Sequence, residues 1–176
     1  MPRPVYTIGH STRSLEELVE LLRAQDVTRL IDIRTVPKSR HNPQFNRDEL
    51  PESLTPYGIA YEHMAALGGL RHARSDSPNT AWENASFRGY ADYMLTEEFA
   101  AALQELIDKS QAETVAIMCA EAVPWRCHRR MVADAVVARG IEVLHIYTAG
   151  KAEAHTMTPW ARIDGTTVSY PGLAFE

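Results

Sequence analysis

What this sequence contains little of already excludes several classes of protein. Two cysteines among 176 residues are too few for a disulfide framework. No apolar run approaches the length that spans a membrane, and the opening residues, MPRPVYTIGHSTRS, contain no apolar signal sequence. Excess positive charge is also lacking: the formal net charge of −5 argues against binding nucleic acid or membranes through bulk charge. We therefore expect a cytoplasmic protein with reduced thiols and no membrane partner.

The rest of the composition is that of an ordinary globular domain, with 45% hydrophobic and 23% charged residues. A chain of this length fits one domain and can bury a sizeable core. The sequence contains no internal repeat and no low-complexity linker. We expect a single domain over residues 1–176, with a core at 7–147 and a C-terminal tail at 148–176.

Short apolar runs alternate with helical patterns along the chain. Strands are expected at residues 4–10, 28–34, 59–64, 114–119 and 141–147. Helices are expected at residues 14–25, where Ser14 and Glu17 match a capping box, at 48–57, after Thr96, and at 125–139. Residues 67–88 show no period and predict a long loop, and GTTVSYPG near the end predicts a strand or hairpin.

Strands that alternate with helices form parallel sheets with right-handed crossovers. We therefore expect an α/β fold: a three-layer Rossmann-like sandwich, with a mostly parallel sheet of about five strands and helices on both faces. The expected strand order, 3-2-1-4-5, makes the first and fourth strands neighbours. Ligands of such sheets bind beyond the carboxyl ends of the strands, so polar residues at those ends are the candidate site.

Titratable side chains follow four of the expected strands, and VAIMCAEAVPWRCHRR (115–130) holds both thiols. Pro124 suits the first position of the expected helix, which places Cys127 and His128 near its first turn. The helix dipole and the neighbouring arginines favour an anion there and depress a thiol pKa. The candidate catalytic residues are His10, Cys119, Glu121, Cys127 and His128.

The same residues also fit less specific interpretations. A lone cysteine that ends an apolar strand is more often a core residue, and an arginine run more often coats a helix. A phosphatase-type Cys-x5-Arg loop does not match, because six residues separate Cys119 from Arg126. The spacing of Cys119, Cys127 and His128 fits no standard metal site, so we predict no metal, and a Cys-x-x-Cys redox motif is absent.

A second basic stretch, DIRTVPKSRHNPQFNRDEL (32–50), suits an anionic ligand, and its amides suit bases or sugar hydroxyls. LGGLRHAR adds two glycines for close backbone approach, and FRGYADYM adds tyrosines that stack on a ring or pack in the core. The candidate ligand-binding residues are Ser11, Arg34, Arg40, Asn42, Gly68, Gly69, Tyr90 and Arg129.

Several motifs occur together in a recognisable order: TIGHS (7–11), DIR (32–34), RHNPQFN (40–46), LGG (67–69), FRGYADYM (87–94), CAE (119–121) and CHR (127–129). Over about residues 7–147 they resemble the domain of unknown function 488 family, in which DVR is more usual than DIR. The resemblance implies a compact α/β domain of bacterial type. It supports one site made of His10, Arg34, Cys119, Glu121, Cys127, His128 and Arg129, but it implies no reaction.

We expect an enzyme that acts on a phosphorylated or nucleotide-like ligand, with nucleic acid as a further possible partner. Cys119 or Cys127 is the expected nucleophile or hydrogen-bonding thiol, and Glu121 or His10 the expected acid or base. One alternative is a non-catalytic module that binds a nucleotide or another anion. Another is thiol chemistry, as in sulfur transfer or redox sensing. The cofactor and the oligomeric state stay open.

Overall fold

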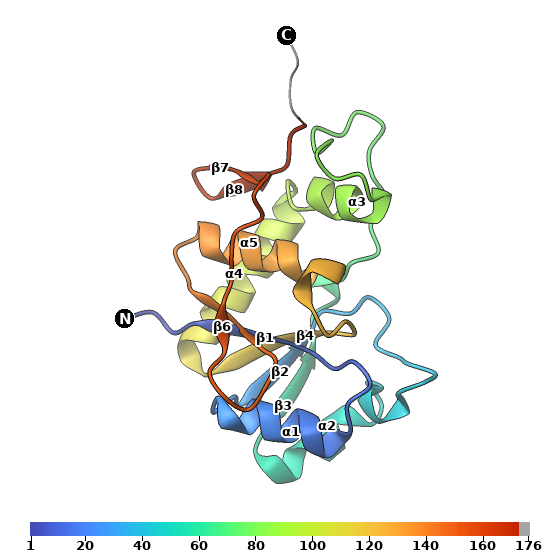
Figure 1. Ribbon diagram of the computed structural model, residues 1–176, viewed down its shortest axis with the longest axis vertical. Coiled ribbons are helices and arrows are strands. Elements are labelled where there is room, and N and C mark those ends of the chain that lie inside the picture. The colour runs from blue at the N-terminus through green and yellow to red at the C-terminus, as the bar shows by residue number, and fades with distance from the viewer. Residues whose placement is uncertain (173–176) are drawn as a thin grey trace.

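A six-stranded mixed sheet lies at the centre of the structure, a computed structural model that describes residues 1–172 (Figure 1). Its strands are β1 (Val5–Gly9), β2 (Arg29–Asp32), β3 (Ala60–His63), β4 (Val115–Cys119), β5 (Val143–Ile146) and β6 (Glu153–Ala154). The first five run parallel, and β6 pairs with β5 in the antiparallel direction. The α/β fold with a mostly parallel sheet is confirmed, although the sheet has six strands rather than about five.

The observed strand order is β3-β2-β4-β1-β5-β6, so the expected order 3-2-1-4-5 is wrong. Strand β4 lies between β2 and β1, and Ile117 pairs with Ile31 on one side and with Thr7 on the other. All residues of β4 are buried, as suits a central strand. The expected contact between the first and fourth strands is nevertheless present, because Gly9 pairs with Cys119.

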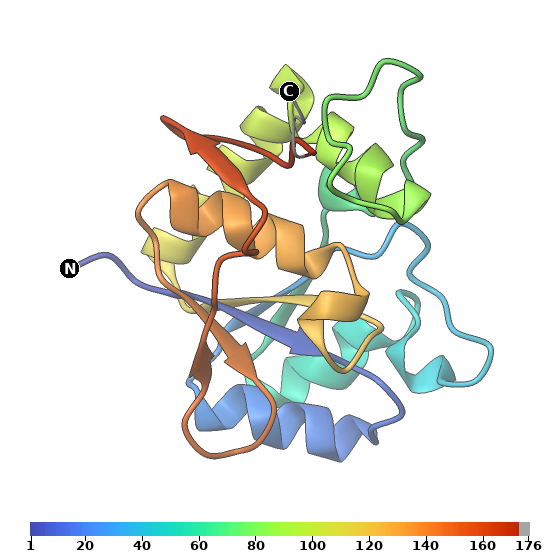
Figure 2. The ribbon, with the colours of Figure 1, turned by 45° about the horizontal axis from the view of Figure 1, so that its top comes forward.

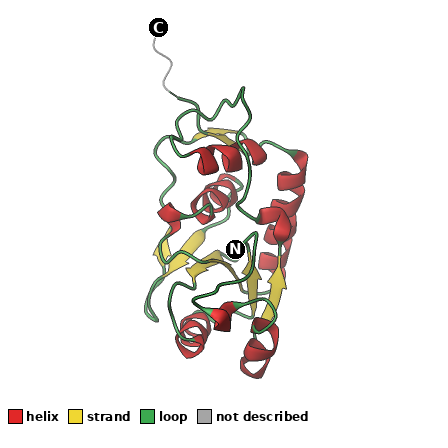
Figure 3. Ribbon diagram, turned by 90° about the vertical axis from the view of Figure 1, so that its right-hand side faces the viewer, coloured by secondary structure: helices red, strands yellow, loops and turns green. Residues whose placement is uncertain are grey.

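Helices cover both faces of the sheet (Figure 3). They are α1 (Leu15–Ala24), α2 (Leu50–Leu54), α3 (Ala85–Tyr93), α4 (Glu97–Ala112) and α5 (Arg129–Ala138). Successive side chains of β4 point to opposite faces. Ile117 therefore packs in a cluster with residues of α4 and α5, whereas Met118 packs with residues of α1 and α2. The predicted capping box of Ser14 and Glu17 begins α1.

Two helices differ from the expected ranges, and both differences concern the surroundings of the thiols. The helix expected at 125–139 begins only at Arg129, because Pro124 starts a separate 3-10 turn, η4 (Pro124–Arg126). Helix α3 occupies part of the loop expected at 67–88. A Cβ atom on Gly89 in this helix would lie 2.3 Å from the Arg71 carbonyl oxygen. The glycine thus weakens the helical pattern but lets the loop pack against the helix.

The C-terminal segment returns across the molecule from β5 to the far side of α5 (Figure 2). It contains a hairpin of β7 (Arg162–Asp164) and β8 (Thr167–Ser169), with Gly165 in the turn at φ +65°. The sequence predicts a strand or hairpin at residues 165–172, and the hairpin begins before that stretch. Tyr170, just beyond β8, is fully buried. Residues 173–176 of the expected tail lie outside the described residues. Among residues 1–172, no helix combines the length and the apolar character needed to cross a bilayer.

Candidate active site

A cavity of about 370 Å³ lies at the carboxyl ends of β1, β2 and β4. All five candidate catalytic residues line it, and so do Arg34 and Gly69 from the ligand-binding set: His10, Arg34, Gly69, Cys119, Glu121, Cys127 and His128. Parallel strands bring these positions together, because their carboxyl ends meet at one edge of the sheet. Lys38 and Arg126, both exposed, add positive charge to the lining.

The two thiols form a coupled pair in the wall of this cavity. Cys119 ends β4 and is 1% exposed, whereas Cys127 follows η4 and is 9% exposed. Burial raises the pKa of Cys119, but a hydrogen bond from Cys127, the charge of Arg129 and a backbone hydrogen bond at Glu121 outweigh it and lower the pKa to about 7. The bond to Cys119 and burial raise the pKa of Cys127. The pair therefore loses its first proton near neutral pH, and that proton comes from Cys119. The thiolate expected at Cys127 thus forms at Cys119.

Arg129 also lowers the pKa of Cys119, after the hydrogen bond from Cys127. Its side chain is fully buried, and its guanidinium donates to the Thr7 hydroxyl (2.7 Å) and to the carbonyl oxygens of Glu121 (3.0 Å) and Ala122 (3.3 Å). Its Nε atom has no hydrogen-bond partner, and no carboxylate of residues 1–172 lies within ion-pair distance of Arg129. A buried charge without compensation costs several kcal/mol. The Cys119 thiolate supplies the missing negative charge.

His128 is held as a neutral imidazole beside Cys127. Its Nε2 atom donates to the Ile33 carbonyl oxygen (2.9 Å), so Nδ1 carries the lone pair and faces the Cys127 sulfur at 3.3 Å. Burial lowers the pKa of His128 to about 4. A Cβ atom on Gly69 would lie 2.5 Å from Nδ1, so this glycine makes room for the ring.

His10 also lines the cavity, with both ring nitrogens already bonded. Nδ1 donates to the Ser11 carbonyl oxygen (2.8 Å), and Nε2 accepts from Arg34 (3.2 Å). The ring also packs on Phe45, with 4.6 Å between centroids. Burial lowers the pKa of His10. Because its lone pair is occupied, His10 suits a positioning role better than that of a general base.

Arg34 reaches the cavity, but its charge is neutralised by Asp32. The guanidinium bonds Asp32 through Nε (2.9 Å) and Nη2 (2.7 Å), and both side chains are buried. Nη2 also donates to the Phe45 carbonyl oxygen at 2.6 Å, and Tyr61 donates to the same carboxylate. Lys38 and Arg126 are therefore the cations in the lining that remain available to a ligand.

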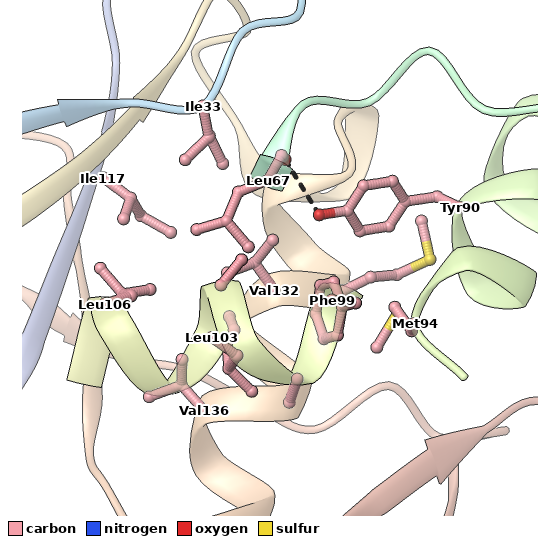
Figure 4. Close-up of a cluster of buried hydrophobic side chains, with 14 of the residues drawn as sticks. Ile33, Leu67, Tyr90, Met94, Phe99, Leu103, Leu106, Ile117, Val132 and Val136 are labelled. Atoms are coloured by element: carbon pink, nitrogen blue, oxygen red, sulfur yellow. Dashed lines mark hydrogen bonds between the residues drawn. The ribbon is translucent and has the colours of Figure 1, made fainter. Parts of the chain in front are cut away.

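Six predicted ligand-binding residues do not line the cavity: Ser11, Arg40, Asn42, Gly68, Tyr90 and Arg129. Tyr90 is fully buried in the apolar cluster between the sheet and α4, where its hydroxyl donates to the Leu67 carbonyl oxygen at 2.9 Å (Figure 4). Arg40 is exposed on the loop after β2, and Gly68 packs against Thr35. Arg129 lies behind the thiols rather than in the cavity wall.

Acid is expected to destabilise the fold where histidines titrate in the unfolded chain. Burial lowers the pKa of His128 to about 4 and that of His145 to about 3, from the usual 6.5. Below about pH 6.5 the unfolded chain binds more protons than the folded protein, so stability is complete above this pH and falls below it. We expect the free energy of unfolding to be roughly 2–4 kcal/mol lower at about pH 5 than at about pH 7. Urea unfolding measures this difference, and equal free energies at both pH values would contradict the neutral-imidazole assignment.

The fold and the cavity define an α/β protein with a thiol-lined site at one edge of a mostly parallel sheet. The chain belongs to the family described as Domain of unknown function DUF488, whose profile matches residues 14–136. This match confirms the family resemblance over a shorter range than 7–147, and it includes both thiols and Arg129. Comparisons with curated proteins and with solved structures found no match. Among residues 1–172, no group of three or more side chains is arranged to hold a metal ion.

Proposed function

We propose that this protein is an enzyme in which the Cys119 thiolate attacks a ligand that carries an anionic group, of the phosphorylated or nucleotide-like kind. One observation carries the proposal: two adjacent thiols line a cavity with two available cations, in front of a buried guanidinium. Arg129 favours the ionised form of Cys119, and the thiolate is the nucleophilic form of cysteine.

The exposed cations of the lining give the ligand its class. Lys38 and Arg126 come from two different segments of the lining, and both are exposed, so either can bind an anionic group. Glu121 is the one carboxylate of the lining, and it lies two residues from the nucleophile. We assign it the role of general base, because Arg34 occupies the lone pair of His10 and burial lowers the pKa of His128 to about 4.

In the proposed reaction, the Cys119 sulfur donates an electron pair to an electrophilic carbon or phosphorus atom of the ligand. The bond from that atom to its leaving group breaks, and the leaving group departs with the electron pair and takes a proton from solvent, to which Glu121 later returns one. A water molecule then displaces the sulfur, and Glu121 accepts its proton, which restores the thiolate. No external oxidant or reductant takes part. The chemistry requires reduced thiols, and both cysteines are free, which suits the cytoplasm.

Two alkylating reagents that differ in charge test this proposal. The measured quantity is the rate of labelling by iodoacetate, an anion, divided by the rate of labelling by neutral iodoacetamide. At about pH 7 we expect this ratio to be higher for Cys119 than for the reference thiol glutathione. Peptide mass spectrometry identifies the labelled sulfur. Substitution of both Lys38→Ala and Arg126→Ala should slow iodoacetate several-fold and leave iodoacetamide unchanged.

The matched control is Arg40→Ala, which removes an exposed arginine outside the cavity. It should alter neither rate. A thermal-shift screen with nucleotides and inorganic phosphate then identifies the ligand, and Cys119→Ser and Glu121→Gln should abolish its turnover in folded protein. Failure of both reagents to label Cys119, or full turnover by both variants, would reject the proposal.

The contact between the thiols favours a second candidate function, reversible disulfide formation. Hydrogen peroxide would oxidise Cys119 and Cys127 to one disulfide and be reduced to two water molecules. Simultaneous loss of both thiols in a titration, with recovery by dithiothreitol and no turnover of any ligand, would support this function over the first.

We also propose that the chain is a three-layer, Rossmann-like domain. The support is the alternation of β4 side chains between a cluster with α1 and α2 and a cluster with α4 and α5. A solved structure with a different number of layers would correct this assignment.

A further inference from the structure

A continuous chain of buried hydrogen bonds connects Arg129 to the C-terminal segment. Arg129 donates to the Thr7 hydroxyl (2.7 Å), and Thr7 lies 2.5 Å from His145 Nδ1. His145 Nε2 then lies 2.8 Å from His155 Nδ1, and His155 Nε2 lies 2.7 Å from Asp134 Oδ1. We name these residues the Arg129–Asp134 relay: Arg129, Thr7, His145, His155 and Asp134. They come from β1, β5, α5 and the segment after β6.

The chemistry of the two ends fixes the direction of every bond in the relay. The Asp134 carboxylate only accepts, so His155 carries its proton on Nε2 and accepts at Nδ1. His145 must then donate from Nε2 and accept at Nδ1 from the Thr7 hydroxyl. Thr7 in turn accepts from Arg129. The opposite direction would give the Thr7 oxygen two donors and leave its own proton without an acceptor among residues 1–172.

Asp134 anchors the far end of the relay and is fully buried. Its carboxylate also accepts from the Tyr170 hydroxyl (2.7 Å) and from the Thr158 backbone N–H (3.1 Å). The relay therefore joins a buried cation to a buried carboxylate through Thr7, His145 and His155, and each bond polarises the next. Three residues that hold the anion, His155, Thr158 and Tyr170, belong to the C-terminal segment, outside the matched residues 14–136.

We propose that Thr7, His145, His155 and Asp134 are positioning residues that hold the Arg129 guanidinium against Cys119, so that the C-terminal segment controls the reactivity of the thiol. The inference rests on the proposed role of Cys119 as nucleophile. Arg129 retains its proton throughout, so the relay orients a charge and transfers no proton to the sulfur. Burial lowers the pKa of His145 to about 3, which keeps this link neutral.

Substitution of Thr7 tests the relay, because valine has the same shape without the hydroxyl. The pH dependence of iodoacetamide labelling at Cys119 gives the midpoint of its ionisation, which also responds to the neighbouring Cys127, His10 and Glu121. We expect Thr7→Val to raise the midpoint by roughly one pH unit, the equivalent of one lost hydrogen bond. Thr7→Ser should restore it, because serine keeps the hydroxyl.

Thr158→Val is the matched control, since the Thr158 hydroxyl is buried and has no hydrogen-bond partner among residues 1–172. It should leave the midpoint unchanged. His155→Gln probes the relay from the C-terminal segment and should raise the midpoint in the same direction, so it provides the test if Thr7→Val does not fold.

The outcomes separate the two proposals. A wild-type midpoint near that of a free thiol, about 8.5, would reject the proposed role of Cys119. If the wild-type midpoint is near about 7 and the Thr7→Val and His155→Gln variants share it, the relay is overturned. The proposed role of Cys119 would then still stand.

Discussion

Arg129→Met is expected to reduce iodoacetamide labelling of Cys119 at about pH 7 by roughly 15-fold. The pKa of this thiol is about 7 beside Arg129, so about half of the sulfur is ionised at that pH. Without the cation, the hydrogen bond from Cys127 remains but burial is less opposed. The pKa then rises toward the ordinary value of about 8.5, where about 3% is ionised at about pH 7. Methionine keeps most of the side-chain length but brings no charge.

Arg129→Lys is the control for this prediction, because it keeps the charge and loses most of the hydrogen bonds to Thr7, Glu121 and Ala122. It should retain part of the reactivity. Circular dichroism and a thermal melt establish that each variant is folded before its labelling rate is compared. A labelling rate for Arg129→Met within about twofold of the wild type would show that Arg129 does not set the ionisation of Cys119.

Arg34→Met is expected to lower the free energy of unfolding by about 3–5 kcal/mol. Asp32 is fully buried, and Arg34, which is 6% exposed, is the one cation paired with its carboxylate among residues 1–172. Removing the guanidinium leaves this carboxylate buried without a counter-charge. It also leaves the Phe45 carbonyl oxygen and His10 Nε2 without their donor.

Arg40→Met offers a matched comparison, since Arg40 is exposed on the loop that follows β2. Its effect should stay within about 0.5 kcal/mol. Urea unfolding of both variants measures the difference, and the double variant Asp32→Asn with Arg34→Met should recover part of the loss, because the unpaired charge is gone. Similar losses for the two arginines would show that the Asp32–Arg34 pair does not stabilise the fold.

The sequence pattern predicts the layout of the site well but not the partners of its charges. Residues at the ends of parallel strands share one edge whatever the strand order, so His10 and Cys119 meet although the expected order is wrong. The central place of β4 depends on long-range pairing, and its uniformly apolar sequence is the main local signal for it.

Burial explains why several predicted ligand-binding residues lie elsewhere. A sequence shows that Arg34, Arg40 and Arg129 are cations. It does not show that Asp32 neutralises Arg34 or that Arg129 is buried. Tyr90 looks like a stacking residue because nothing local reveals that its hydroxyl bonds to Leu67 inside the core. The role of His155 was equally hidden, since its partners are distant in sequence.

The ionisation of Cys119 is read directly from the ultraviolet absorbance of the thiolate during a pH titration of the folded protein. We predict one step near pH 7 in the wild type, and its loss in Cys119→Ser, which keeps the size of the side chain and removes the thiol. A wild-type protein whose absorbance first rises above about pH 8.5, as for an ordinary cysteine, would contradict the pairing of Cys119 with Arg129.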